Sequence, residues 1–130
     1  MEKEREEQVI SLCQKLIQQK SYSGEESGVV GVLSENMKQM GFDEVTVDKY
    51  GNIIGCIKGN RPGKKVLFDG HIDTVPVTEE AEWLYPPFAA EIHDGKIYGR
   101  GTSDMKGAVA AMTCAASNYA KDTGKDFAGE

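Results

Sequence analysis

The sequence is poor in cysteine and histidine. Its 130 residues contain three cysteines and two histidines. Cys13, Cys56 and Cys114 are far apart and form no Cys-x-x-Cys pair, which fits a reducing compartment, where cysteine serves as a small apolar side chain. All three lie within apolar patterns, so we expect them in the core and not in catalysis.

Long apolar runs and clusters of basic residues are also missing. No stretch approaches the roughly 18 apolar residues of a membrane span, and the N-terminal MEKEREEQ lacks the apolar part of a signal peptide. The formal net charge of −6 argues against binding nucleic acid or an anionic membrane. We therefore expect a cytoplasmic protein with a small-molecule partner, no nucleic-acid partner and no membrane partner.

The hydrophobic pattern predicts one domain of the α/β class. Apolar residues spaced three and four apart predict helices over 9–17, over 23–40 and from near Met105 to Tyr119. Alternating or compact apolar residues predict strands at 45–47, 53–57 and 65–69, and a hairpin turn at Asp94-Gly95. Ser23 is expected to cap the second helix and Gly41 to end it. The order of elements indicates a sheet covered by helices.

One histidine stands between two carboxylates in LFDGHIDTVP, residues 67–76. In an extended segment His71 and Asp73 would face the same side, about 7 Å apart along the chain. Such a short pattern is common by chance, and then the histidine is satisfied locally while Asp73 caps a turn. The other interpretation is a metal ligand whose tautomer is fixed by a neighbouring carboxylate. The motif alone leaves both open.

A further acid, Asp104, stands in the glycine-rich YGRGTSDMKG, residues 98–107. Asp104 could simply cap the following helix, but that role does not explain glycines on both sides, which suit a backbone folded closely around something. A nucleotide-binding loop is the weaker alternative, because Asp104 occupies the place of the third glycine of that motif. That alternative predicts protection by NAD or ATP in a thermal shift, which we do not expect.

The two motifs, in this order and at this distance, resemble the zinc-dependent aminoacylase, acetylornithine deacetylase and succinyl-diaminopimelate desuccinylase family, which also includes glutamate carboxypeptidases and di- and tripeptidases. The resemblance runs from YSGEE through YGN and GHIDTVP to DGKIYGRGTSDMKG. It implies that His71 binds one of two zinc ions, that Asp104 bridges both, and that Asp73 is the catalytic residue that orients the histidine. Cobalt or manganese could substitute for zinc. It also implies a cis peptide bond between Asp104 and Met105.

The resemblance further implies a zinc-exopeptidase-like fold, with a mixed central sheet flanked by helices, and hydrolysis of amide bonds in N-acyl amino acids or short peptides. The family's Glu-Glu pair, its later acid and histidine ligands, and its oligomerisation domain have no counterpart here, and we do not assign Glu130 to that pair. We expect 1–130 to be the N-terminal part of an incomplete catalytic domain, inactive alone, from a protein that could be a homodimer. The alternative is a non-catalytic fragment that acts as a metal-binding or interaction module.

Three other polar residues, His93, Arg100 and Lys106, stand near these motifs in the sequence. The family pattern assigns nothing to His93, which we expect at the surface. Arg100 and Lys106 could each bind a substrate carboxylate or serve locally at a turn or helix start, and the sequence does not decide between these roles.

Overall fold

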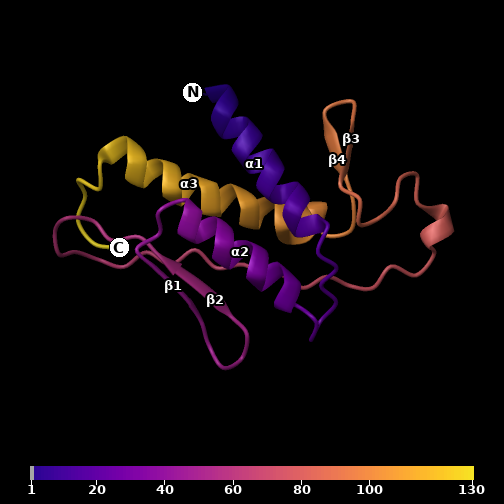
Figure 1. The fold of residues 1–130 in the computed structure, drawn as a ribbon, viewed down its shortest axis with the longest axis horizontal. Coiled ribbons are helices and arrows are strands. Elements are labelled where there is room, and N and C mark those ends of the chain that lie inside the picture. Colours follow the sequence, from indigo (N-terminus) through magenta and orange to yellow (C-terminus); the bar gives the residue numbers. More distant parts are fainter. Residues whose placement is uncertain (1) are drawn as a thin grey trace.

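A layer of helices forms the centre of the structure, a computed structural model that describes residues 2–130 (Figure 1). The α-helices among these residues are α1 (Glu2–Ile17), α2 (Ser27–Gln39) and α3 (Gly107–Thr123). Helix α1 packs against both α2 and α3. The three helices predicted from the hydrophobic spacing are confirmed, and the first begins earlier than its apolar stripe does.

The core lies between the apolar faces of these three helices. Its buried side chains come mainly from α1 and α2, with small residues on α3; they are Leu12, Cys13, Leu16, Ile17, Val29, Leu33, Met37, Val109, Ala110 and Cys114. Burial raises the pKa of the Cys13 and Cys114 thiols, so both stay protonated and behave as apolar side chains. The expectation of core cysteines is confirmed for these two, whereas Cys56 is only half-buried.

The two ends of α2 differ in how well the sequence predicted them. Gly41 has a φ of +85°, and the N–H groups of Gly41 and Phe42 donate to the carbonyls of Lys38 and Met37, so the predicted glycine ending is confirmed. The predicted cap at Ser23 is wrong. The helix begins at Ser27, so Glu26 occupies the cap position and makes no side-chain cap bond, while the Ser23 hydroxyl donates to Asp73.

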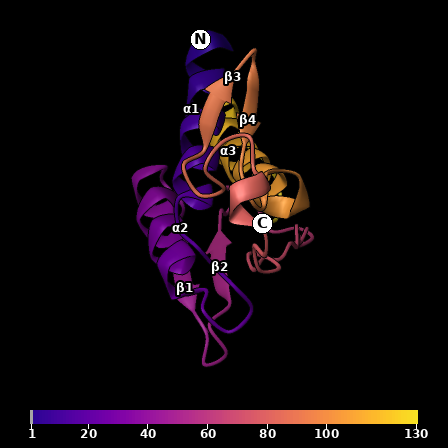
Figure 2. The ribbon, with the colours of Figure 1, turned by 90° about the vertical axis from the view of Figure 1, so that its right-hand side faces the viewer.

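Two antiparallel hairpins lie on different sides of the helices (Figure 2). One pairs β1 (Glu44–Val47) with β2 (Ile53–Cys56), and the other pairs β3 (Glu91–His93) with β4 (Lys96–Tyr98). Asp94 and Gly95 both have positive φ, of 51° and 73°, as a tight hairpin turn requires. The α/β class is confirmed, but the residues described here form two separate two-stranded sheets and not one continuous mixed sheet.

The strand predicted over 65–69 is wrong for this structure. Its apolar side chains stay exposed, with relative exposures of 67% for Val66, 84% for Leu67 and 70% for Phe68. A strand needs a ladder of backbone hydrogen bonds to a neighbour. Within the described residues this segment has only the start of one, in which the N–H of Val66 donates to the Glu130 carbonyl over 2.8 Å and the N–H of Glu130 donates to Lys64 over 3.1 Å.

Candidate metal site

Two segments that are 33 residues apart in sequence meet at His71 and Asp104. The imidazole Nε2 of His71 lies 2.7 Å from Oδ1 of Asp104, and the backbone N–H of His71 points at the sulfur of Met105 over 3.4 Å. Both side chains face solvent, His71 at 48% and Asp104 at 85% relative exposure. The structure therefore brings the two predicted metal ligands together at an open surface.

Asp73 holds the other side of the same imidazole ring. The Nδ1 of His71 lies 3.1 Å from both the side-chain Oδ1 and the backbone carbonyl of Asp73. Both of these atoms accept hydrogen bonds, so Nδ1 carries a proton in this contact, and Nε2 carries one as well when it donates to Asp104. The predicted orienting contact is therefore present, and it leaves Nε2 as the nitrogen that faces Asp104.

A glycine turn places Asp104 in front of α3. Gly101 has a φ of +88°, and a Cβ there would lie 2.8 Å from Cγ2 of Thr74, so a larger residue would separate the two segments. The backbone leaves helical geometry at Asp104, with φ −132° and ψ 94°, and α3 begins only at Gly107. Asp104 is therefore not the cap of this helix. The predicted cis peptide bond between Asp104 and Met105 is confirmed.

Lys106 acts locally, although its sequence position also suggested a substrate contact. The side chain is fully buried, with 1% relative exposure, and its ammonium donates to the carbonyls of Leu16 over 2.9 Å and Gln19 over 2.7 Å. Burial lowers the pKa of Lys106 to about 8. These bonds attach the Asp104 turn to the end of α1, where the Leu16 carbonyl also accepts from the N–H of Gln19 over 3.2 Å.

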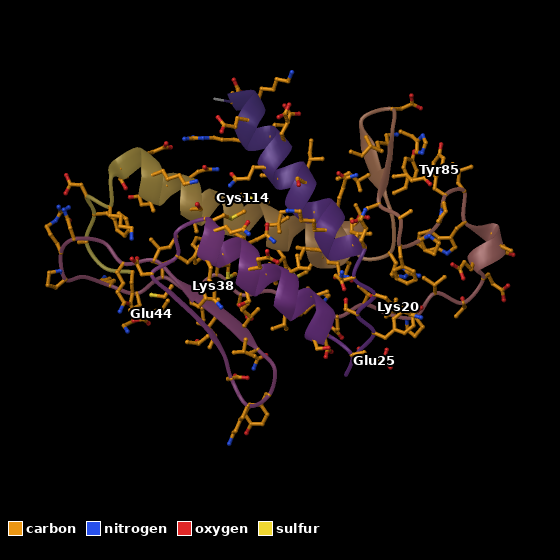
Figure 3. All side chains as sticks on the ribbon, in the orientation of Figure 1. Lys20, Glu25, Lys38, Glu44, Tyr85 and Cys114 are labelled. Carbon is orange, nitrogen blue, oxygen red and sulfur yellow. The ribbon has the colours of Figure 1, made fainter. Side chains whose placement is uncertain are left out.

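Arg100 and His93 also have local partners. The guanidinium of Arg100 lies over the Trp83 ring at 5.1 Å, while its backbone N–H donates to Pro87. His93 lies half-buried at the surface, with 38% of its side chain exposed. Its ring stacks on Tyr85, which Figure 3 labels beside the β3–β4 hairpin, with ring centres 3.8 Å apart, and its Nε2 lies 2.8 Å from Glu91. Neither residue belongs to the group around His71.

The carboxylates around His71 change its protonation. The hydrogen bond to Asp104, followed by the one to the Asp73 carbonyl, raises the pKa of His71 above its ordinary value of 6.5. The hydrogen bond from Ser23 is the largest cause of the lowered pKa of Asp73. The charge on His71 is the next largest contribution that lowers it. The extra imidazole proton stabilises the folded chain fully below pH 6.5, and this contribution is lost as the pH rises through the raised pKa of His71.

We expect an Asp104→Asn substitution to lower the pKa of His71 toward 6.5, because Asp104 is the largest cause of its elevation. The measurement is an NMR titration of the two imidazoles in the metal-free chain. His93 serves as the internal control, since its partners Tyr85 and Glu91 are untouched by the substitution. An unchanged His71 titration in the variant would contradict the contact.

The donor types suit a divalent metal, but their number is small. A neutral imidazole nitrogen and a carboxylate are both ordinary zinc ligands. Within residues 2–130, however, no group of three or more His, Cys, Asp or Glu side chains is placed to hold a metal ion. His71 and Asp104 therefore fit as two members of a metal site, and a closed four-ligand site would need further donors.

Three findings relate the chain to known proteins. The family model of peptidase family M20/M25/M40 matches residues 67–127. A succinyl-diaminopimelate desuccinylase from Vesicomyosocius okutanii subsp. Calyptogena okutanii (strain HA) is 37% identical over 115 residues, which are 87% of this chain and 30% of that relative. The fold matches an M20 family metallo-carboxypeptidase, Sso-CP2 from Sulfolobus solfataricus, with a TM-score of 0.71 at 24% identity, over 92% of this chain and 28% of the other.

The chain thus spans less than a third of the length of each of these relatives. The matched family region includes His71, Asp73 and Asp104. Among the residues that the structure describes, no helix is long and apolar enough to cross a membrane.

Proposed function

We propose, from the resemblance of this chain to peptidase family M20/M25/M40 in sequence and fold, that it forms the N-terminal part of the catalytic domain of a metal-dependent amide hydrolase. The observation that carries the proposal is the meeting of His71 Nε2 and Asp104 Oδ1 at 2.7 Å, with Asp73 on the opposite ring nitrogen. Both named relatives are enzymes, so a non-catalytic interaction module is not favoured.

His71 and Asp104 are the residues that would hold the metal. His71 offers Nε2, which must first lose the proton that it shares with Asp104, so binding weakens as the pH falls through the raised pKa of His71. Asp104 would offer its carboxylate oxygens as the second donor group. Bound metal of this kind supplies a water of lowered pKa and polarises the amide carbonyl.

Asp73 keeps the imidazole ready for this task. Because Asp73 accepts from Nδ1, the ring presents Nε2 toward Asp104 and cannot turn over without losing both of its 3.1 Å contacts. The negative charge on Asp73 also makes the imidazole more basic and thus a better donor to a cation. In this proposal Asp73 acts through His71 and does not itself bind metal.

The finer assignments rest on the resemblance and on the donor types. We assign two zinc ions as the resident metal, replaceable by cobalt or manganese, and N-acyl amino acids or short peptides as substrates. The complete protein would be cytoplasmic, in keeping with the unpaired Cys13, Cys56 and Cys114 of the described chain. A homodimer is the assembly that the family resemblance suggests.

The test is hydrolysis by the protein extended beyond Glu130. After removal of metal with a chelator, we expect no release of free amine from a panel of N-acyl amino acids and dipeptides, and recovery when zinc, cobalt or manganese is added back. Activity that persists in the metal-free protein, or the absence of turnover on the whole panel with every metal, would overturn the proposal.

A further inference from the structure

The connector between α1 and α2 runs beside the segment that carries His71. The N–H of Thr74 donates to the Ser21 carbonyl, and the Ser21 hydroxyl donates to the carbonyl of Ile72, each over 2.8 Å. Ser21 is fully buried, Tyr22 pairs with Thr74 in a parallel bridge, and the Tyr22 hydroxyl accepts from the N–H of Val77. The segment around His71 is thus held by the connector and not by a sheet.

This connector aims the Ser23 hydroxyl at Asp73. Ser23 Oγ lies 2.5 Å from Oδ2 of Asp73. The backbone around it is fixed, because the N–H of Glu25 donates to Tyr22 over 2.7 Å and Gly24 has a φ of +90°. Figure 3 labels Lys20, which precedes this stretch in sequence, and Glu25, which follows Ser23; both lie below the end of α1.

Ser23 and His71 hold the two oxygens of one carboxylate. Oδ2 of Asp73 accepts from Ser23, and Oδ1 accepts from Nδ1 of His71 over 3.1 Å. With both oxygens engaged, the carboxylate cannot rotate about its Cβ–Cγ bond without breaking a hydrogen bond. Held in this orientation, the carboxylate accepts the Nδ1 proton of a neutral His71 together with the Asp73 backbone carbonyl, and so favours that tautomer over the one with the proton on Nε2, where Asp104 competes for it.

We propose that Ser23 is a positioning residue of the metal site, which fixes the Asp73 carboxylate and thereby keeps the Nε2 lone pair of His71 available to a cation. This inference rests on the proposed function, because it takes His71 as a metal donor. The hydroxyl itself touches neither Nε2 nor Asp104. Its effect is carried by the chain of hydrogen bonds from Ser23 to Asp73 to His71.

The experiment compares Ser23→Ala and Ser23→Thr in the 130-residue chain. The tautomer of His71 is read from long-range ¹H–¹⁵N NMR of the metal-free protein, at a pH well above the pKa of His71. We expect the wild type and Ser23→Thr to hold the Nδ1–H tautomer and Ser23→Ala to shift toward Nε2–H. In a zinc titration of the protein extended beyond Glu130, Ser23→Ala should bind about threefold to tenfold more weakly, a smaller loss than the 10–100-fold typical of a ligand's direct partner.

Ser117→Ala is the matched control. Ser117 is equally a serine with a single hydroxyl bond, buried on α3, where it donates to the Met40 carbonyl over 2.8 Å. This variant should lower thermal stability and leave the His71 tautomer unchanged. The inference is overturned if Ser23→Ala keeps the wild-type tautomer, or if Ser117→Ala shifts it equally. A wild-type protein extended beyond Glu130 that takes up no zinc would count against the proposed function, whereas a tautomer shift in Ser23→Ala would still support the positioning role.

Discussion

Replacing His71 by alanine in the protein extended beyond Glu130 is expected to remove most of its bound zinc and nearly all hydrolysis. His71 Nε2 is one of only two donors in residues 2–130 that meet at the site. Asp104 alone would retain a carboxylate at 85% exposure, which water solvates well and which binds a lone cation weakly. The measurement is the zinc content of the purified protein, together with the rate of amine release.

The Asp73→Asn variant should behave differently, because Asp73 acts through His71. The asparagine keeps the size of the side chain but loses its charge, so the imidazole becomes less basic and less firmly oriented. We expect zinc to remain bound in an excess of the metal while turnover falls by about 10–100-fold. If both variants lose zinc equally, or if Asp73→Asn loses more than His71→Ala, the assigned roles are wrong.

The 130-residue chain itself is expected to hydrolyse neither N-acyl amino acids nor dipeptides, whatever metal is supplied. A zinc site that supports catalysis takes about three protein ligands, and residues 2–130 bring together two, His71 and Asp104. Among the described residues, the carboxylates that contact His71 are Asp73 and Asp104, which already have other roles in the proposal, and a separate positioned base would contribute roughly 10²–10⁴ in rate. The missing ligand weakens metal binding and the missing base slows proton transfer, so the two losses in rate multiply.

The assay compares this chain with the extended protein in excess zinc, cobalt or manganese. Turnover by the chain alone that survives purification and disappears in His71→Ala would show that a base was overlooked. Glu130 is a poor candidate for that base, because its carboxylate pairs with Lys65 over 2.5 Å and its backbone lies against residues 64–66.

Locally determined elements were the most predictable from sequence. The helices follow from apolar residues on one face, and the β3–β4 hairpin follows from the positive φ that Asp94 and Gly95 tolerate. The segment 65–69 has the right composition for a strand but only the beginning of a ladder, because pairing depends on distant residues that no local pattern specifies.

The part of the site that was predictable is the pairing of His71 with Asp104, because the family resemblance connects the two distant motifs that contain them. His71 and Asp104 are 33 residues apart, and no local rule brings them together. Ser23 was missed because a serine followed by acidic residues has the signature of a helix cap, and its true partner, Asp73, lies 50 residues away. Lys106 left two roles open because only tertiary packing shows that its ammonium reaches the end of α1.

The most direct test of the central claim, that His71 and Asp104 hold metal together, is a crystal structure of the extended protein with zinc, with data collected at the zinc absorption edge. The account predicts two anomalous peaks. Nε2 of His71 should lie about 2.0–2.1 Å from one of them, and the Asp104 carboxylate should have an oxygen on each. Zinc bound elsewhere, with His71 Nε2 still paired directly to Asp104, would contradict it.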